Sequence, residues 1–331
     1  MTNKYREYFD IDEEYFPQIN DSSIAAASPD FWTRTYPHQT FIDMLTNMER
    51  VLSRQEKRSL WIEGAYGTGK SQCAYALKKI LEVPEDELRE YWNRYEPLKK
   101  KSDLLEKLLG HKQKGIVTAH RYASGGIGSP RDLFLAIQDS LKAALVEQNL
   151  YEGENTLKES VIAWIDEPSH KLFFDALLQK PEWSALFSQS NTDEVLTALR
   201  KGGEVKNLMD NIFRLADKEG ITALNINADR LLAWLTDIID QNNVKIVFIW
   251  DEFSDYFKNN RESLSEFQKI AELVNLKPFY FIVVTHESGQ LFTTADSTWT
   301  KVRDRFIPVQ IALPDNIAFN LIGHAFNVKP A

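Results

Sequence analysis

The segment from Gly64 to Ser71 reads Gly-x-x-x-x-Gly-Lys-Ser, and its residue types suit the binding of phosphate groups. Glycine adopts positive φ at little steric cost, so successive main-chain N–H groups of such a loop can turn toward one anion. Lys70 would neutralise β- and γ-phosphate oxygens, and the Ser71 hydroxyl would be a ligand of Mg²⁺. The residues that we expect to bind nucleotide are Gly64, Ala65, Tyr66, Gly67, Thr68, Gly69, Lys70, Ser71 and Gln72.

The residues on either side of this loop predict the elements that would position it. A short apolar run, Leu60 to Glu63, comes before the loop, and an amphipathic pattern from Gln72 to Leu81 follows it. The order strand, glycine loop and helix is the setting in which the pattern has physical meaning, because the positive end of the helix dipole then faces the phosphates. A chance glycine turn is the alternative. The segment therefore predicts that the chain binds a nucleoside triphosphate together with Mg²⁺.

A second polar group follows a strongly apolar run later in the chain. The predicted strand from Ile246 to Trp250 ends in Asp251 and Glu252. Ligands of open α/β sheets collect at the carboxyl ends of strands, so these carboxylates should face the phosphates. Asp251 would hold Mg²⁺ through its water shell, and Glu252 would polarise the attacking water as general base. An acidic turn after a core strand is the alternative.

Other polar residues are weaker candidates for the same site. Thr285, or else His286, would sense the γ-phosphate from the tip of the next strand, although either could be a simple polar strand cap. Arg303 and Arg305 could neutralise transition-state charge in the site of a neighbouring subunit, or form surface ion pairs with Asp304 or Asp296. Tyr36 precedes a helical pattern and could stack on the purine.

The remaining pattern predicts an α/β fold. Near-continuous apolar strands separated by helices indicate a parallel sheet that is covered on both faces. The region from 151 to 226 shows helical spacing and nothing that resembles a strand. We expect strands at 115–122, 244–250, 279–285 and 307–313, and helices at 38–56, 132–146, 229–240 and 262–276, while 1–37 should be irregular or partly extended.

Composition limits the classes of function. The 331 residues are 43% hydrophobic and 26% charged, which is ordinary for a globular chain. The net charge of −9 argues against a nucleic-acid grip over the whole surface, and the run Lys99 to Lys101 is more typical of a solvated face. The single cysteine, Cys73, suggests packing in a reducing compartment. No apolar run could span a bilayer, so we expect a cytoplasmic protein without membrane contact.

The order of five features along the chain resembles that of the AAA+ and related P-loop ATPases of the additional-strand, catalytic-glutamate (ASCE) class. The features are Tyr36-Pro37, the glycine loop, Ile246 to Glu252, Thr285, and Arg303-x-Arg305-Phe306. The resemblance implies a sheet of order 5-1-4-3-2 and ATP hydrolysis. It also implies assembly into a homo-oligomer whose ATP sites are shared between subunits.

The chain departs from that class in two ways. The stretch between Ser71 and Asp251 is long enough to require a helical insertion of about a hundred residues, which is the natural place for contacts with a partner protein. The helical lid that this class places after the fifth strand is reduced to a first helix at 316–327, so we expect either that the lid is absent or that the chain is the N-terminal piece of a longer protein. Large ATPases of bacterial anti-phage systems begin in a loosely similar way. The expected divisions are 1–58, the loop half of the core at 59–150, the insertion at 151–226 and the second half at 227–331.

Two functions from different classes follow. The first is an ATPase that couples hydrolysis to conformational work on a partner, with a nucleic-acid motor as a special case that the acidic charge does not support. The second is a nucleotide-gated oligomeric scaffold or switch with little turnover. A phosphotransferase fits less well, because Glu252 beside Asp251 suits the activation of water and no motif for a separate acceptor is present.

Overall fold

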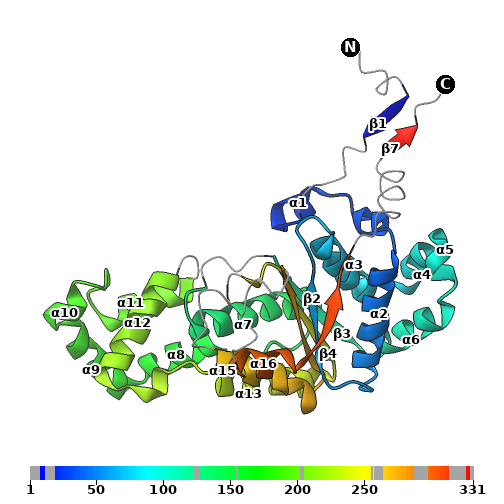
Figure 1. The fold of residues 1–331 in the computed structure, drawn as a ribbon. Helices are drawn as coiled ribbons and strands as arrows, with labels where there is room; N and C mark the ends of the chain where they lie inside the picture. Colours follow the sequence, from blue (N-terminus) through cyan, green and yellow to red (C-terminus); the bar gives the residue numbers. More distant parts are fainter. Residues whose placement is uncertain are drawn as a thin grey trace.

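A five-stranded sheet, in which all neighbouring strands are parallel, forms the centre of the molecule (Figure 1). The computed structural model describes residues 8–11, 19–122, 127–153, 156–201, 205–254, 256, 264–286, 297–312 and 326–328. The sheet contains β2 (Ser59–Glu63), β3 (Ile116–Arg121), β4 (Lys245–Trp250), β5 (Phe279–Thr285) and β6 (Phe306–Gln310), in the spatial order β3-β4-β5-β2-β6. Helices cover both faces, so the expected α/β class is confirmed.

The strands are apolar on both sides because both faces of the sheet are buried. In β5, Phe281 and Val283 belong to one core cluster, whereas Ile282 and Val284 belong to the other. Successive side chains of a strand point to opposite faces, so one continuous apolar run supplies both cores. This explains why β5 has the bounds that its sequence predicts.

One face of the sheet packs against the helices that surround the glycine loop. His38 caps the first of them, since its ring accepts a hydrogen bond from the Phe41 N–H at 3.3 Å. The helix after the loop starts at Lys70, with Gly69 as its left-handed N-cap. The helices of this face are α2 (Gln39–Leu52), α3 (Lys70–Glu82), α4 (Glu85–Arg94), α5 (Glu96–Lys99) and α6 (Ser102–Lys112).

The opposite face packs against helices from the second half of the chain and against α7. Ser129 and Asn227 are side-chain N-caps of the two longest of these helices. The helices and 3₁₀ turn of this side are α7 (Pro130–Glu147), α13 (Ala228–Asn242), α15 (Leu264–Glu272), η5 (Leu273–Asn275) and α16 (Ser297–Arg303).

The described part of the predicted insertion is helical and contains no strand. Its helices extend away from the sheet on the left of Figure 1, and their apolar faces join the core cluster of α7 and α13. They are α8 (Leu157–Asp166), α9 (Pro168–Leu178), α10 (Pro181–Ser184), α11 (Thr192–Lys201), α12 (Lys206–Glu219) and η3 (Thr222–Leu224).

The N-terminal segment is more regular than its sequence predicts. It contains α1 (Asp21–Ala26), which begins with a capping box at Asn20, and a 3₁₀ turn, η2 (Phe31–Arg34). A separate antiparallel pair joins β1 (Phe9–Ile11) to β7 (Phe326–Val328). Most of the predicted lid helix, 316–325, lies outside the described residues. Its last two positions belong to β7, so the prediction of helix is wrong there.

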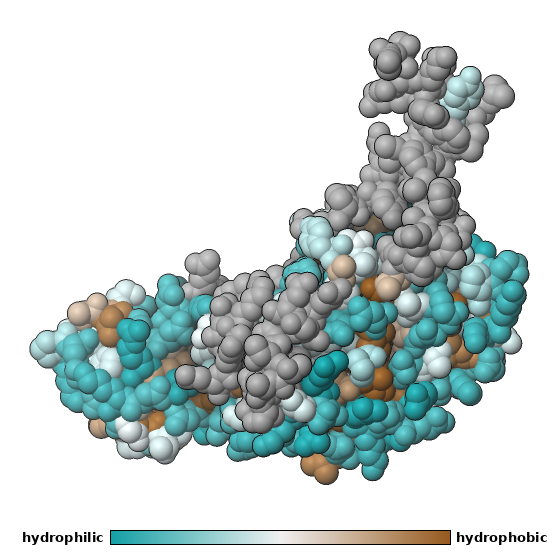
Figure 2. Space-filling model, in the orientation of Figure 1, coloured by the Kyte–Doolittle hydropathy of each residue, from teal (hydrophilic) through white to brown (hydrophobic). Residues whose placement is uncertain are grey.

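The face of the molecule in Figure 2 is mainly hydrophilic, with small and separate apolar spots. On the insertion, Leu172, Phe173 and Leu186 are exposed large apolar side chains. Among the described helices, none has the length and apolar character needed to cross a membrane.

Candidate functional site

The loop between β2 and α3 has the backbone conformation that its glycines predict, with one correction. Gly67 and Gly69 have φ values of 79° and 83°, in the left-handed region that favours glycine. Gly64 has no positive φ. It is required for space instead, because a Cβ atom there would lie 2.3 Å from the main-chain oxygen of Ile311 and 2.9 Å from Thr68 Oγ1.

The loop folds around the side chain of Lys70. The Lys70 ammonium donates a hydrogen bond to the Ala65 carbonyl oxygen at 2.9 Å, and the Thr68 hydroxyl donates to the same oxygen at 2.9 Å. Lys70 is only 8% exposed. Ser71 and Gln72 lie in the first turn of α3, which begins at Lys70. The positive end of the helix dipole and the Lys70 ammonium group therefore lie close together.

Asp251 comes to this volume from the end of β4. Its carboxylate accepts a hydrogen bond from the Glu252 N–H at 2.8 Å and lies close enough to the Ser71 side chain for Ser71 to lower its pKa. Its own N–H donates to the carbonyl oxygen of Arg121, the last residue of β3, at 2.7 Å. Burial raises the pKa of Asp251 to about 6, against the opposing effects of Ser71 and Lys70. A buried carboxylate beside a serine hydroxyl is a donor set that suits Mg²⁺.

Glu252 adopts a conformation that is unusual for its residue type. Its φ of 56° places a non-glycine residue in the left-handed region, which costs energy and is found at functional sites as well as in turns. Its side chain is half exposed, and its Oε2 lies 3.7 Å from Nε2 of His286. The carboxylate therefore lies near the end of β5, and its negative charge also contributes to the raised pKa of Asp251.

The two predicted sensor residues have different surroundings. Thr285 is 2% exposed, and its hydroxyl accepts a hydrogen bond from the Trp61 indole at 2.9 Å, within the core that α7 and α13 cover. His286, the second choice, is next to Glu252, and its N–H donates to the Ser254 hydroxyl at 3.0 Å. The sequence offers no signal for the Trp61–Thr285 bond, because β2 and β5 are far apart in the chain.

Arg303 and Arg305 lie at the other edge of the sheet from the loop. The Arg305 carbonyl accepts a hydrogen bond from Ser59, the first residue of β2, whereas the loop follows the last residue of β2. One strand length, about 16 Å for five residues, separates the two edges. The Arg305 guanidinium pairs with Glu272 at 2.8 Å, a partner that the sequence does not suggest, and Asp296 lies outside the described residues. The structure does not bring these arginines to the loop of the same chain.

Tyr36 lies in the segment that runs beside α3. Its ring meets Tyr95 edge-on, with centroids 5.8 Å apart. Two residues later, Nε2 of the His38 ring lies 3.7 Å from the Cys73 sulfur in α3. Burial raises the pKa of Cys73 to about 12, so the thiol stays protonated, in agreement with a packing role.

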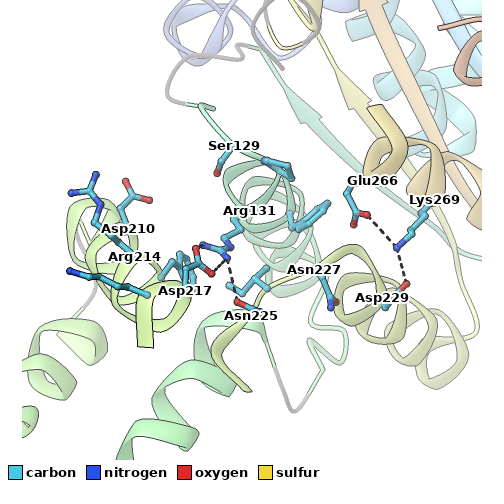
Figure 3. A pocket seen from close by; sticks show the side chains of 15 residues that line it. Ser129, Arg131, Asp210, Arg214, Asp217, Asn225, Asn227, Asp229, Glu266 and Lys269 are labelled. Atoms are coloured by element: carbon cyan, nitrogen blue, oxygen red, sulfur yellow. Dashed lines mark hydrogen bonds and ion pairs between the residues drawn. The ribbon is translucent and has the colours of Figure 1, made fainter. Parts of the chain in front are cut away.

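A separate cavity of about 1010 Å³ lies between the insertion and the core (Figure 3). Its charged side chains largely pair with one another. Arg131 of α7 forms two hydrogen bonds with Asp217 of α12, at 2.9 and 2.6 Å, and Lys269 of α15 pairs with Asp229 of α13. None of the predicted site residues lines it. The lining residues are Ser129, Pro130, Arg131, Phe134, Asp210, Phe213, Arg214, Asp217, Lys218, Asn225, Ile226, Asn227, Asp229, Glu266 and Lys269.

In comparisons with known proteins, the sequence matched no family model and no curated protein.

Proposed function

We propose that this chain is a Mg²⁺-dependent P-loop ATPase of the AAA+-like ASCE class. The observation that carries the proposal is the approach of the buried Asp251 carboxylate to Ser71 and Lys70, both of which act on its pKa, so that the tip of β4 lies at the first turn of α3. The sheet gives further support. If β2 is counted as the first strand and β6 as the fifth, the spatial order β6-β2-β5-β4-β3 reads 5-1-4-3-2. The resemblance implies this order.

Main-chain N–H groups of the loop would hold the β- and γ-phosphates, and Lys70 would neutralise their charge. Ser71 and Asp251 would hold Mg²⁺, which supplies positive charge opposite the phosphate oxygens. Glu252 would accept a proton from the attacking water, and His286, at 3.7 Å, would orient the Glu252 carboxylate. Tyr36 would lie on the purine side of α3.

The arginines at the far edge suit a shared site. Because Arg303 and Arg305 lie about one strand length from the loop of their own chain, either could act only on the nucleotide of a neighbouring subunit. A homo-oligomer of this kind would place them there. In the proposed coupling, the insertion would contact a partner protein, and anti-phage defence is the setting that the resemblance suggests.

The test is steady-state hydrolysis of ATP with and without Mg²⁺. We expect Lys70→Ala to abolish turnover, and Glu252→Gln to lower it at least a hundredfold while ATP remains bound. Arg89→Ala is a matched control, because Arg89 is a cation on α4 that pairs with Glu85 and Glu106 on the surface. Undiminished turnover of Lys70→Ala at saturating ATP would refute the proposal.

The conformation of Glu252 favours one alternative, a nucleotide-gated scaffold with little turnover. The carboxylate is half exposed and lies beside His286, so the group proposed as general base is open to bulk water. In this alternative ATP changes the size of the assembly, and Glu252→Gln assembles as the unmodified protein does. Light scattering with and without ATP, measured beside turnover, separates the two functions.

A further inference from the structure

The side chain of Tyr66 is far more exposed than its place in the phosphate loop requires. It is 82% exposed, although it lies between Gly64 and Gly67 in the middle of the loop. The loop would use main-chain N–H groups to hold phosphate, so almost any side chain would serve at this position. The aromatic ring contributes little to the core, and its removal should leave the fold intact.

The ring contact that the structure gives Tyr66 is with His286. The two ring centroids are 6.2 Å apart and the planes are inclined by 33°, within the range of aromatic pairs. His286 in turn lies 3.7 Å from the carboxylate of Glu252. Three side chains, from the loop and from the residues that follow β5 and β4, therefore form a row that ends at the proposed general base.

This row leaves Glu252 open to water. The Glu252 side chain is 50% exposed and that of His286 is 34% exposed. A general base works best when its carboxylate is fixed and when bulk water does not compete for its hydrogen bonds. An aromatic ring beside the imidazole limits rotation of the imidazole, and this helps to fix the carboxylate that the imidazole contacts.

We propose that Tyr66 is a positioning residue for ATP hydrolysis: its ring holds the His286 imidazole against the Glu252 carboxylate. This role rests on the proposed function. It assigns a task to the side chain of Tyr66, beyond the phosphate contacts of its main chain.

The test compares Tyr66→Ala with Tyr66→Phe in steady-state ATP hydrolysis, with ATP affinity measured separately by calorimetry. We expect Tyr66→Ala to lower kcat about tenfold with KM and ATP affinity within about twofold, because the main chain still holds the phosphates. Tyr66→Phe keeps the ring and should restore kcat. Phe173→Ala, which removes an exposed ring from α9 in the insertion, should leave kcat unchanged.

A double variant tests whether Tyr66 acts through His286. If it does, Tyr66→Ala should have no further effect on kcat in a His286→Ala background, since the two losses are not additive. Additive losses, an unchanged kcat, or a rise in KM alone would overturn the role of Tyr66. Turnover that survives Lys70→Ala would refute the proposed function itself, whereas turnover that Lys70→Ala abolishes and Tyr66→Ala preserves would refute the role of Tyr66 alone.

Discussion

Replacement of Asp251 by asparagine should make the protein more stable and remove its response to Mg²⁺. A carboxyl whose pKa rises from 3.8 to about 6 disfavours ionisation by about 3 kcal/mol. The folded protein binds this proton more tightly than the unfolded chain, so the penalty is absent below pH 3.8, grows as the pH rises, and is fully present above about pH 6. Asparagine has nearly the same shape and can still accept the hydrogen bond from the Glu252 N–H.

At pH 7.5 we expect Asp251→Asn to raise the free energy of unfolding by about 2 kcal/mol, and Tm by about 4 °C. At pH 5 the gain should shrink, because the native carboxyl is then largely protonated. Thermal denaturation should also show that Mg²⁺ with ATP stabilises the native protein much more than the variant. The control is Asp103→Asn, which removes an acid from the first turn of α6. A variant that is less stable than the native protein at pH 7.5 would refute this reasoning.

Three further predictions concern other parts of the fold. Gly64→Ala should destabilise the protein by about 1–3 kcal/mol and weaken ATP binding, because the added Cβ would collide with the main chain of Ile311. Gly110→Ala in α6 is the control: its Cβ has free space, so it should stabilise the protein slightly, and urea denaturation compares the two variants. Arg131→Ala should speed hydrogen exchange in α12, and Arg131→Asp combined with Asp217→Arg should slow it again. Burial lowers the pKa of His111, so the stability of the folded protein should fall as the pH drops through about 6.5. His111→Gln should make this loss of stability smaller, as measured by the midpoint of urea denaturation at each pH.

The parts of the fold that could be predicted from the sequence are those that local pattern determines. β5 is one apolar run, and a strand buried on both faces needs nothing else. The loop was predictable because Gly67 and Gly69 need a conformation that few other residues adopt. In contrast, α1 is six residues long and depends on its capping box. A helix this short has too little apolar periodicity to be recognised in the sequence.

Side-chain partners could not be predicted, because they come from distant segments. The choice between Thr285 and His286 depends on what surrounds each side chain, and the Trp61 indole engages the Thr285 hydroxyl. The partner of Arg305 is likewise Glu272 of α15, not a neighbour in sequence. Composition and spacing report what a residue is able to do, whereas the approach of another strand or helix determines what it touches.

Because Glu252 has a left-handed backbone, selection for stability and selection for activity should favour different residues at position 252. A library sorted only for expression and heat resistance should enrich glycine there, since glycine relieves about 1 kcal/mol of torsional strain. A library sorted for work done per molecule of nucleotide should retain the acid. The difference between the enrichment of glutamate in the activity-sorted library and in the stability-sorted library would measure how much the Glu252 carboxylate contributes to activity.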